Sequence, residues 1–255
     1  MPEMYVRDHF VYFQDTMKSS SHTILFLHGV GGSHYMFRDQ WARLKGTARL
    51  IIPDLPGHAR SGGTPLETIS QAVGWLADFV KELGLKKFIL AGHSMGGAIA
   101  IEAALKEMPG IEALIIISSG AKLKVDPEIV QGITERFNDF APEFVDRMLS
   151  SETSADLRED VLQGFLSTRL ETHLADFRMC NGFDRMDRIG VIRLPTLIIN
   201  GTEDGLIPQK YGEYLATNIP GAVLKIMHGT GHLPVLERPV ELGAVITAFL
   251  HSLDL

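Results

Sequence analysis

Short apolar runs alternate with amphipathic segments along most of the chain. The apolar runs predict strands near residues 3–7, 9–14, 23–27, 48–52, 87–91, 112–117, 195–200 and 222–226. The segments between them predict helices near residues 36–45, 68–83, 94–107, 208–218 and 239–252. Strands and helices in alternation are typical of a mostly parallel sheet covered on both faces. The pattern therefore predicts an α/β fold with eight strands, of which the first two form an antiparallel start.

One region interrupts this alternation. Between Ser118 and about Arg193 no strand pattern occurs, and the periodicity predicts helices at 127–140, 142–150 and 155–170. We therefore expect a core domain formed by residues 1–121 and 188–255, with a helical insertion at 122–187. Most large apolar side chains of the insertion are expected to pack it onto the core, and a minority to line a substrate pocket. They are Phe137, Phe140, Phe144, Met148, Leu149, Phe165, Met179, Phe183 and Met186.

A strand, a tight turn and a helix are predicted around the segment Gly92-His93-Ser94-Met95-Gly96. Ser94 stands at the apex of the turn, and the glycines two positions to either side let the backbone fold back on itself. The apical hydroxyl is exposed at the N-terminus of a helix, where free N–H groups stabilise developing negative charge. These are the features of a nucleophile. A serine nucleophile also needs a base to take its proton and a carboxylate to orient that base.

Two loops downstream supply candidates for the carboxylate and the base. Asp204 follows one predicted strand and His232 follows the next, so both are expected at the carboxyl edge of the sheet, beside Ser94. Glu203 is the rival acid, and His228 is the rival base. Three further histidines are interpreted as packing or hydrogen-bonding residues: His28, His58 and His93.

The order Ser94, Asp204, His232 resembles that of the α/β-hydrolase family, whose triad runs serine, acid, histidine along the chain. Four further segments are similar to the family's pattern. They are the oxyanion loop at 28–33, the Asp-x-Pro-Gly loop at 54–61, the acid loop at 201–208 and the histidine loop at 231–239. In the second of these, Ala59 stands where the family commonly has glycine, which bears on the shape of the loop. The resemblance spans residues from about 23 to 240.

The resemblance implies an α/β-hydrolase fold in which the insertion is a helical cap over the active site. It favours Asp204 over Glu203 as the acid, because the segment from Gly201 to Pro208 is similar to the family's Gly-x-x-Asp-x-x-x-Pro. Two backbone N–H groups are expected to bind the oxyanion. One belongs to Met95, at the start of the helix after the nucleophile, and the resemblance points to Val30 for the other.

These residues predict a serine hydrolase that cleaves a small, largely apolar carboxylic ester through an acyl-enzyme intermediate. Large, soft side chains in the insertion favour an apolar substrate. The same triad also serves thioesterases, enol-lactonases and carbon–carbon bond hydrolases in the family the chain resembles. A hydrolase-like receptor that senses a ligand in the same pocket is a further alternative. The residues do not separate these activities.

Composition narrows the possible partners. Of the 255 residues, 45% are hydrophobic and 22% charged, as in an ordinary soluble enzyme, and the net charge of -7 argues against a nucleic-acid partner. No P-loop lysine follows the glycines at 28–32 and no metal-binding motif occurs, so no cofactor and no metal are expected. The single cysteine, Cys180, is interpreted as an apolar filler. The sequence shows no signal peptide and no membrane span, which predicts a cytoplasmic enzyme and leaves the oligomeric state open.

Overall fold

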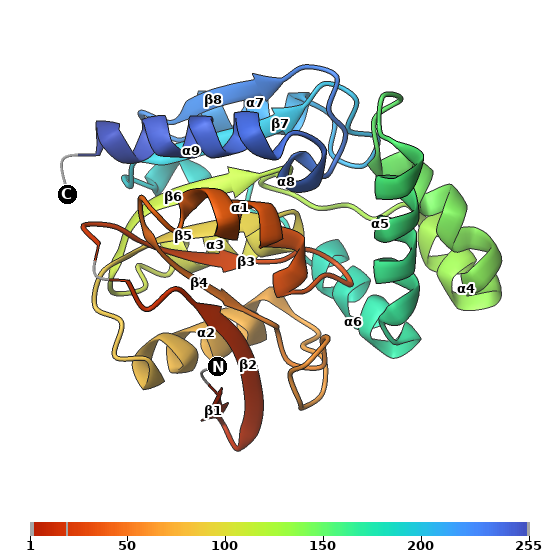
Figure 1. The fold of residues 1–255 in the computed structure, drawn as a ribbon, viewed down its shortest axis with the longest axis horizontal. Helices are drawn as coiled ribbons and strands as arrows, with labels where there is room; N and C mark the ends of the chain where they lie inside the picture. The colour runs from red at the N-terminus through yellow and green to blue at the C-terminus, as the bar shows by residue number, and fades with distance from the viewer. Residues whose placement is uncertain (1–2, 19, 254–255) are drawn as a thin grey trace.

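An eight-stranded sheet forms the centre of the structure, a computed structural model that describes residues 3–18 and 20–253 (Figure 1). The strands lie in the order β1-β2-β4-β3-β5-β6-β7-β8. β2 pairs antiparallel with β1 and β4, and the others pair parallel. The strands are β1 (Glu3–Val6), β2 (His9–Asp15), β3 (Thr23–Leu27), β4 (Arg49–Pro53), β5 (Phe88–His93), β6 (Ile111–Ile117), β7 (Thr196–Gly201) and β8 (Val223–Met227). The predicted α/β fold and its antiparallel start are confirmed.

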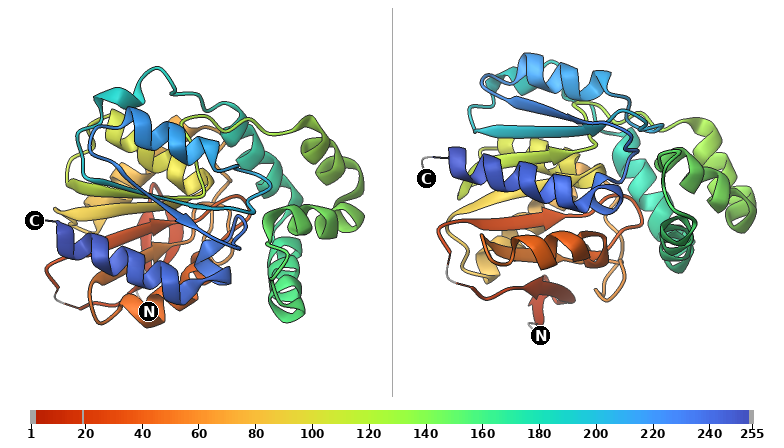
Figure 2. Two further views of the ribbon diagram at one scale, coloured as in Figure 1. Left: turned by 90° about the horizontal axis from the view of Figure 1, so that it is seen from above. Right: turned by 45° about the horizontal axis from the view of Figure 1, so that its top comes forward.

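Helices cover both faces of the sheet (Figure 2). On one face lie α2 (Ile69–Glu82), α3 (Met95–Leu105) and α7 (Lys210–Asn218), and on the other lie α1 (Arg38–Leu44), α8 (Pro234–Glu237) and α9 (Pro239–Ser252). Two short 3-10 turns, η1 (His34–Phe37) and η2 (Ile189–Val191), complete this part of the chain. Among the described residues, none of the helices is both long enough and apolar enough to cross a bilayer.

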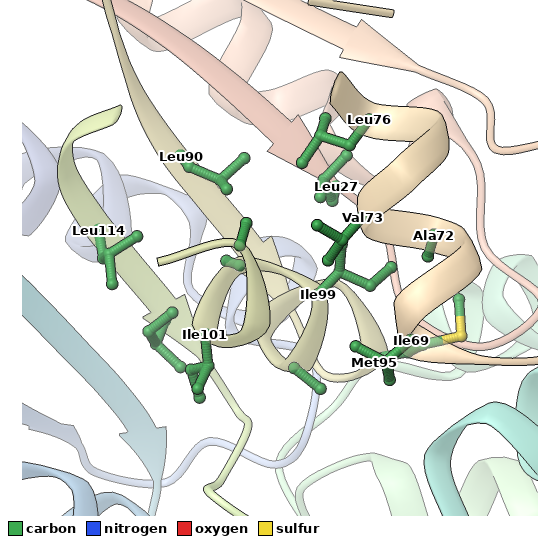
Figure 3. Close-up of a cluster of buried hydrophobic side chains, with 14 of the residues drawn as sticks. Leu27, Ile69, Ala72, Val73, Leu76, Leu90, Met95, Ile99, Ile101 and Leu114 are labelled. Atoms are coloured by element: carbon green, nitrogen blue, oxygen red, sulfur yellow. The ribbon is translucent and has the colours of Figure 1, made fainter. Parts of the chain in front are cut away.

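The core between α2, α3 and the sheet holds α3 rigidly (Figure 3). Leu27 and Leu90 from the strands face Val73 of α2 and Ile99 of α3, and all four side chains are buried. All six residues of β5 are buried, as expected for a parallel strand covered on both faces. Burial of nearly every residue of α3 leaves that helix little freedom to move. The buried strand β5 and the buried helix α3 therefore hold the turn between them in one position.

The segment between β6 and β7 forms three further helices, α4 (Pro127–Met148), α5 (Ala155–Ser167) and α6 (Leu170–Asn181). We call them the inserted helices. They lie together beyond one end of the sheet (Figures 1 and 2). An isolated antiparallel bridge joins Lys122 to Asp184 where the chain leaves and rejoins the core. The limits 122 and 187 for a separate domain stay a prediction.

The predicted break between residues 140 and 142 is wrong. Pro142 lies inside α4, and the backbone leaves helical geometry earlier, at Arg136, with φ −146° and ψ 47°. The kink turns the second half of the helix back, so the ring of Phe140 lies within 2.5 Å of where a Cβ on Gly132 would be. Arg136 then covers the same ring and pairs with Glu143. The bend of this helix accompanies the packing of Phe140 on Gly132, a contact that the helical periodicity of the sequence does not reveal.

The large apolar side chains of the inserted helices divide between two clusters. Phe140, Phe144 and Phe165 belong to a cluster that the insertion forms largely by itself, whereas Met179 and Phe183 join the main core beside α3. The prediction that most of these side chains pack the insertion onto the core is therefore wrong: Met179 and Phe183 do so, whereas the majority pack within the cluster of the insertion. Met186 does neither, because 40% of its surface is exposed.

Candidate active site

Ser94 occupies a strained turn between β5 and α3. Its backbone has φ 52° and ψ −116°, and among residues 91–100 it is the one that is not buried. A Cβ on Gly96 would lie 2.2 Å from the carbonyl oxygen of Leu27, and a Cβ on Gly92 would lie 2.1 Å from the carbonyl oxygen of Gly96. Side chains at these two positions are therefore impossible, as the sequence pattern predicts. Strain of this kind is kept where a side chain must be presented.

Asp204 and His232 come together at the carboxyl ends of β7 and β8. The Nδ1 of His232 lies 2.8 Å from Oδ2 of Asp204, and both side chains are buried. The second oxygen, Oδ1, accepts hydrogen bonds from the backbone N–H groups of Leu206 at 2.9 Å and Ile207 at 2.8 Å. With the carboxylate held from both sides, its hydrogen bond places the proton of His232 on Nδ1 and leaves Nε2 as the basic nitrogen.

Three contacts hold the loop that carries His232. The backbone N–H of His232 donates to the carbonyl oxygen of Met148 at 2.6 Å. The carboxylate of Glu237 accepts from the N–H groups of Gly231 and Leu233. The Nε2–H of His93 donates to the carbonyl oxygen of His232 at 2.7 Å. Burial, and after it the neighbouring His232, lowers the pKa of His93 to about 3, so His93 is a neutral donor, which confirms its interpretation as a hydrogen-bonding residue.

The two rival residues lie elsewhere. Glu203 is exposed and accepts hydrogen bonds from the N–H and the hydroxyl of Ser151, which lower the pKa of its carboxyl group. His228 is exposed as well. Asp204 and His232 are therefore the pair that the structure brings together, and Glu203 and His228 take no part in that contact.

Ser94 and His232 line one cavity of about 300 Å³ between the sheet and the inserted helices. Within the part of the chain that the structure describes, no hydrogen bond joins the Ser94 hydroxyl to His232. Catalytic hydrogen bonds are often long until substrate binds, so shared access to one cavity is the relevant geometry. The walls are mainly apolar, with contributions from Val30, Met36, Val125, Ile129, Phe144, Met148, Phe177, Leu206 and Ile207.

The backbone N–H groups of Val30 and Met95 have no hydrogen-bond acceptor among the described residues. Met95 is the first residue of α3, so its N–H has no carbonyl one turn back in the helix. Val30 lies in a turn closed by a hydrogen bond from the N–H of Gly32 to the carbonyl oxygen of Gly29, 3.1 Å long, and it lines the cavity. These are the two donors that the sequence predicts for an oxyanion.

The family assignment rests on a match along most of the chain. A family model described as the alpha/beta hydrolase family matches residues 24–245. The chain belongs to the alpha/beta hydrolase family.

Individual relatives and solved structures are similar to this chain along nearly its whole length. An uncharacterized hydrolase of Bacillus subtilis is 26% identical over 94% of each chain. The pimeloyl-acyl-carrier-protein methyl ester esterase of Proteus mirabilis is also 26% identical, over 96% of this chain and 98% of the relative. A solved esterase from Thermogutta terrifontis has a TM-score of 0.87 and 25% identity, with 98% of both chains covered. The enol-lactonase of Burkholderia xenovorans, at 21% identity and a TM-score of 0.90 over 98% of this chain and 100% of its own, shares the fold.

Some groups around the site could not be predicted from the sequence. The carbonyl of Met148 and the N–H groups of Leu206 and Ile207 act through the backbone, which no residue pattern records. Lys124 and Lys210, at the rim of the cavity, are single lysines in ordinary polar segments. Among the described residues, no group of three or more His, Cys, Asp or Glu side chains is arranged to hold a metal ion.

Proposed function

We propose that this hydrolase is a serine esterase in which Ser94, His232 and Asp204 form the catalytic triad. Ser94 attacks the ester carbonyl, His232 takes the hydroxyl proton on Nε2 and returns it to the leaving alcohol, and Asp204 orients His232 and stabilises its cation. Water then hydrolyses the acyl-enzyme by the same route. The observation that carries this proposal is the cavity shared by Ser94 and His232, with the Asp204 contact of 2.8 Å behind it.

The oxyanion of the tetrahedral intermediate is bound, in this proposal, by the N–H groups of Val30 and Met95. Neither N–H has an acceptor among the described residues, Val30 lines the cavity and Met95 follows Ser94, which supports the assignment. The positive end of α3 adds to the effect at Ser94. The inserted helices act as a cap that forms the cavity wall opposite the triad.

The cavity favours a small and largely apolar ester. Its volume of about 300 Å³ lies at the lower end of the range for ligand pockets, roughly 300–1,000 Å³. We expect kcat/KM on p-nitrophenyl esters to rise about fourfold for each methylene group that the cavity buries, as ~0.8 kcal/mol per methylene implies. It should fall once the acyl chain outgrows the cavity. The measurement is a series of acyl lengths with a fluorophosphonate label of Ser94 in parallel.

The outcomes of that series separate the candidate activities. Multiple turnover with a maximum at short acyl chains supports the esterase. Labelling of Ser94 without turnover of any ester contradicts it and favours a carbon–carbon bond hydrolase or a ligand-sensing protein. Turnover of thioesters or enol-lactones far above that of esters assigns the same triad to those substrates.

A second candidate function arises from the rim of the cavity. Lys124, Arg147 and Lys210 stand there with Asp126, although the chain as a whole carries a net charge of -7. Arg147 lies 3.9 Å from Glu128, and neither lysine has an ion pair among the described residues. The relative from Proteus mirabilis is named for a methyl ester on an acyl-carrier protein. A rim with surplus positive charge suits an acyl ester presented by a carrier with an acidic surface.

Neutralising the rim tests this second function. We expect Lys124→Gln and Lys210→Gln each to raise KM for a carrier-bound methyl ester about fivefold, because an exposed ion pair contributes up to ~1 kcal/mol. KM for a p-nitrophenyl ester should stay the same. Lys225→Gln is the matched control, since Lys225 is an exposed lysine on β8 outside the cavity lining. Equal KM values for the carrier-bound ester in all three variants would exclude a role of the rim.

A further inference from the structure

A buried ion pair, separate from the triad residues, joins the inserted helices to the core. Oδ2 of Asp176, on α6, lies 2.8 Å from Nε2 of His58, in the loop after β4. The side chain of Asp176 is 0% exposed and that of His58 is 2% exposed. Neither residue lines the cavity, and the triad chemistry uses neither. The purpose of this pair is therefore open.

The hydrogen bonds around His58 make it a cation. Its Nε2 faces the carboxylate of Asp176, and its Nδ1 lies 3.1 Å from the carbonyl oxygen of Pro56. Both partners are acceptors, so both ring nitrogens donate and the ring carries two protons. Burial lowers the pKa of His58, but the charge and hydrogen bond of Asp176 outweigh burial and leave the pKa above its ordinary value.

Asp176 also holds the loop that carries Val30. The same oxygen, Oδ2, accepts a hydrogen bond of 2.8 Å from the N–H of Gly31. The carbonyl oxygen of Gly31 accepts one of 2.8 Å from the hydroxyl of Thr168, at the end of α5. Both polar groups of Gly31 are thus bound by the insertion. Gly31 has φ +61° and packs against His173, whose ring lies 2.2 Å from where a Cβ would be, so no other residue fits.

The turn geometry links this clamp to the proposed oxyanion donor. Val30 and Gly31 are the two central residues of the turn closed from Gly32 to Gly29. Asp176 binds the N–H of the peptide that joins Val30 to Gly31, so it holds Val30, the residue of the proposed donor, from its C-terminal side. We propose that Asp176 and His58 are positioning residues that hold the Val30 N–H in place for the oxyanion, an inference that rests on the proposed esterase function.

Stability alone does not explain the pair. The other oxygen of Asp176, Oδ1, is buried and has no hydrogen-bond partner in the part of the chain described by the structure. A buried carboxylate with one unpaired oxygen is unfavourable, and a buried ion pair is often no better for stability than apolar residues of the same size. A pair that stability does not require, and that holds the peptide next to Val30, fits a role in catalysis.

The decisive variant is Asp176→Asn, which keeps the shape of the side chain and removes the charge. We expect kcat to fall about 10- to 100-fold, less than the ~10²- to 10³-fold that loss of a whole oxyanion donor causes. KM should stay within about twofold. Asp15→Asn is the matched control, because Asp15 is also a buried carboxylate, paired with Arg49 at 2.6 Å, and lies on β2. Its kcat should equal that of the wild type.

A transition-state analogue separates positioning from general damage. A trifluoromethyl ketone adds Ser94 to its carbonyl and places the resulting oxyanion in the hole, whereas the product carboxylic acid binds without that step. We expect Asp176→Asn to lower the affinity for the ketone by the same factor as it lowers kcat/KM. The affinity for the acid should stay unchanged. If the variant loses affinity for both ligands by the same factor, the pair only maintains the folded structure of the site, and the positioning role is wrong.

The pH profile gives an independent test that needs no variant of Asp176. The ion pair is complete below the ordinary pKa of histidine and is lost as the pH rises through the raised pKa of His58, so kcat of the wild type should fall on the alkaline side. The other titratable groups around the pair are His28, Asp54 and His173 near His58, and Cys180 near Asp176. Burial lowers the pKa of His28 to about 4, lowers that of His173 and raises that of the Cys180 thiol, so none of these three masks the fall.

His58→Gln completes the test, because an amide N–H can still donate to Asp176 but does not titrate. We expect it to retain more kcat than His58→Ala and to lose the alkaline fall. An alkaline fall of equal size in His58→Gln, or wild-type kcat in Asp176→Asn, would overturn the inference. A wild type that turns over no ester would remove the proposed esterase function and this inference with it, whereas active variants beside an active wild type would remove the inference alone.

Discussion

Ser94→Ala should lower kcat for ester hydrolysis by about 10⁵- to 10⁶-fold, the size of effect expected when the nucleophile of a serine triad is lost. The oxyanion donors and the cavity remain, so some acceleration over water should persist. Folding should be unaffected, because the Ser94 side chain caps no helix and alanine keeps the Cβ at the strained turn. The free energy of unfolding should change by less than about 0.5 kcal/mol. Turnover of a p-nitrophenyl ester and urea unfolding measure the two quantities.

Ser118→Ala is the control for this variant. Ser118 follows β6, the strand next to β5, and it too has a positive φ, of 47°. Its hydroxyl is buried and has no partner among the described residues, so its removal leaves no group unsatisfied. Ser118→Ala should keep wild-type turnover and fluorophosphonate labelling. If Ser94→Ala retains more than about a hundredth of wild-type kcat, another group supplies the nucleophile and the proposed mechanism is wrong.

The sequence predicted the parts of the fold that rest on local patterns. Apolar runs and alternation were sufficient for all eight strands. The inner parallel strands are the clearest, because strands buried on both faces of a sheet contain little but apolar residues. The turn at Ser94 was also predictable from a local pattern, because close backbone contacts require its two glycines. The rule that carboxyl ends of parallel strands meet at one edge placed the loops of Asp204 and His232 together, and the resemblance to the family favoured Asp204 over Glu203.

Contacts between distant segments were beyond such reasoning. Asp176 occupies an unremarkable position in α6, and only the packing of that helix against residues 31 and 58 gives it a partner. His58 was interpreted as a hydrogen-bonding residue, which is confirmed, but its charge depends on a carboxylate 118 residues away. The kink of α4 depends on Phe140 meeting Gly132. Each of these features is a property of tertiary packing, which a single sequence does not encode in any local pattern.

Asp204→Asn should lower kcat about 10⁴-fold, the second largest effect among these variants. The amide keeps an oxygen that can accept from Leu206 and Ile207, so the loop should hold its shape. An amide nitrogen turned toward His232 donates where the carboxylate accepted. It therefore stabilises the tautomer with the proton on Nε2, and that tautomer cannot take a proton from Ser94. KM should change little, because Asp204 is absent from the cavity lining.

Glu203→Gln is the matched control, because it makes the same change from carboxylate to amide one residue away. Glu203 is exposed and bound to Ser151, so its loss should leave kcat within about twofold of the wild type. If Glu203→Gln instead loses as much activity as Asp204→Asn is expected to lose, the acid has been assigned to the wrong residue. Near-normal kcat in both variants would mean that His232 needs no carboxylate. The contact of 2.8 Å would then be structural, and the nucleophile would depend on His232 alone.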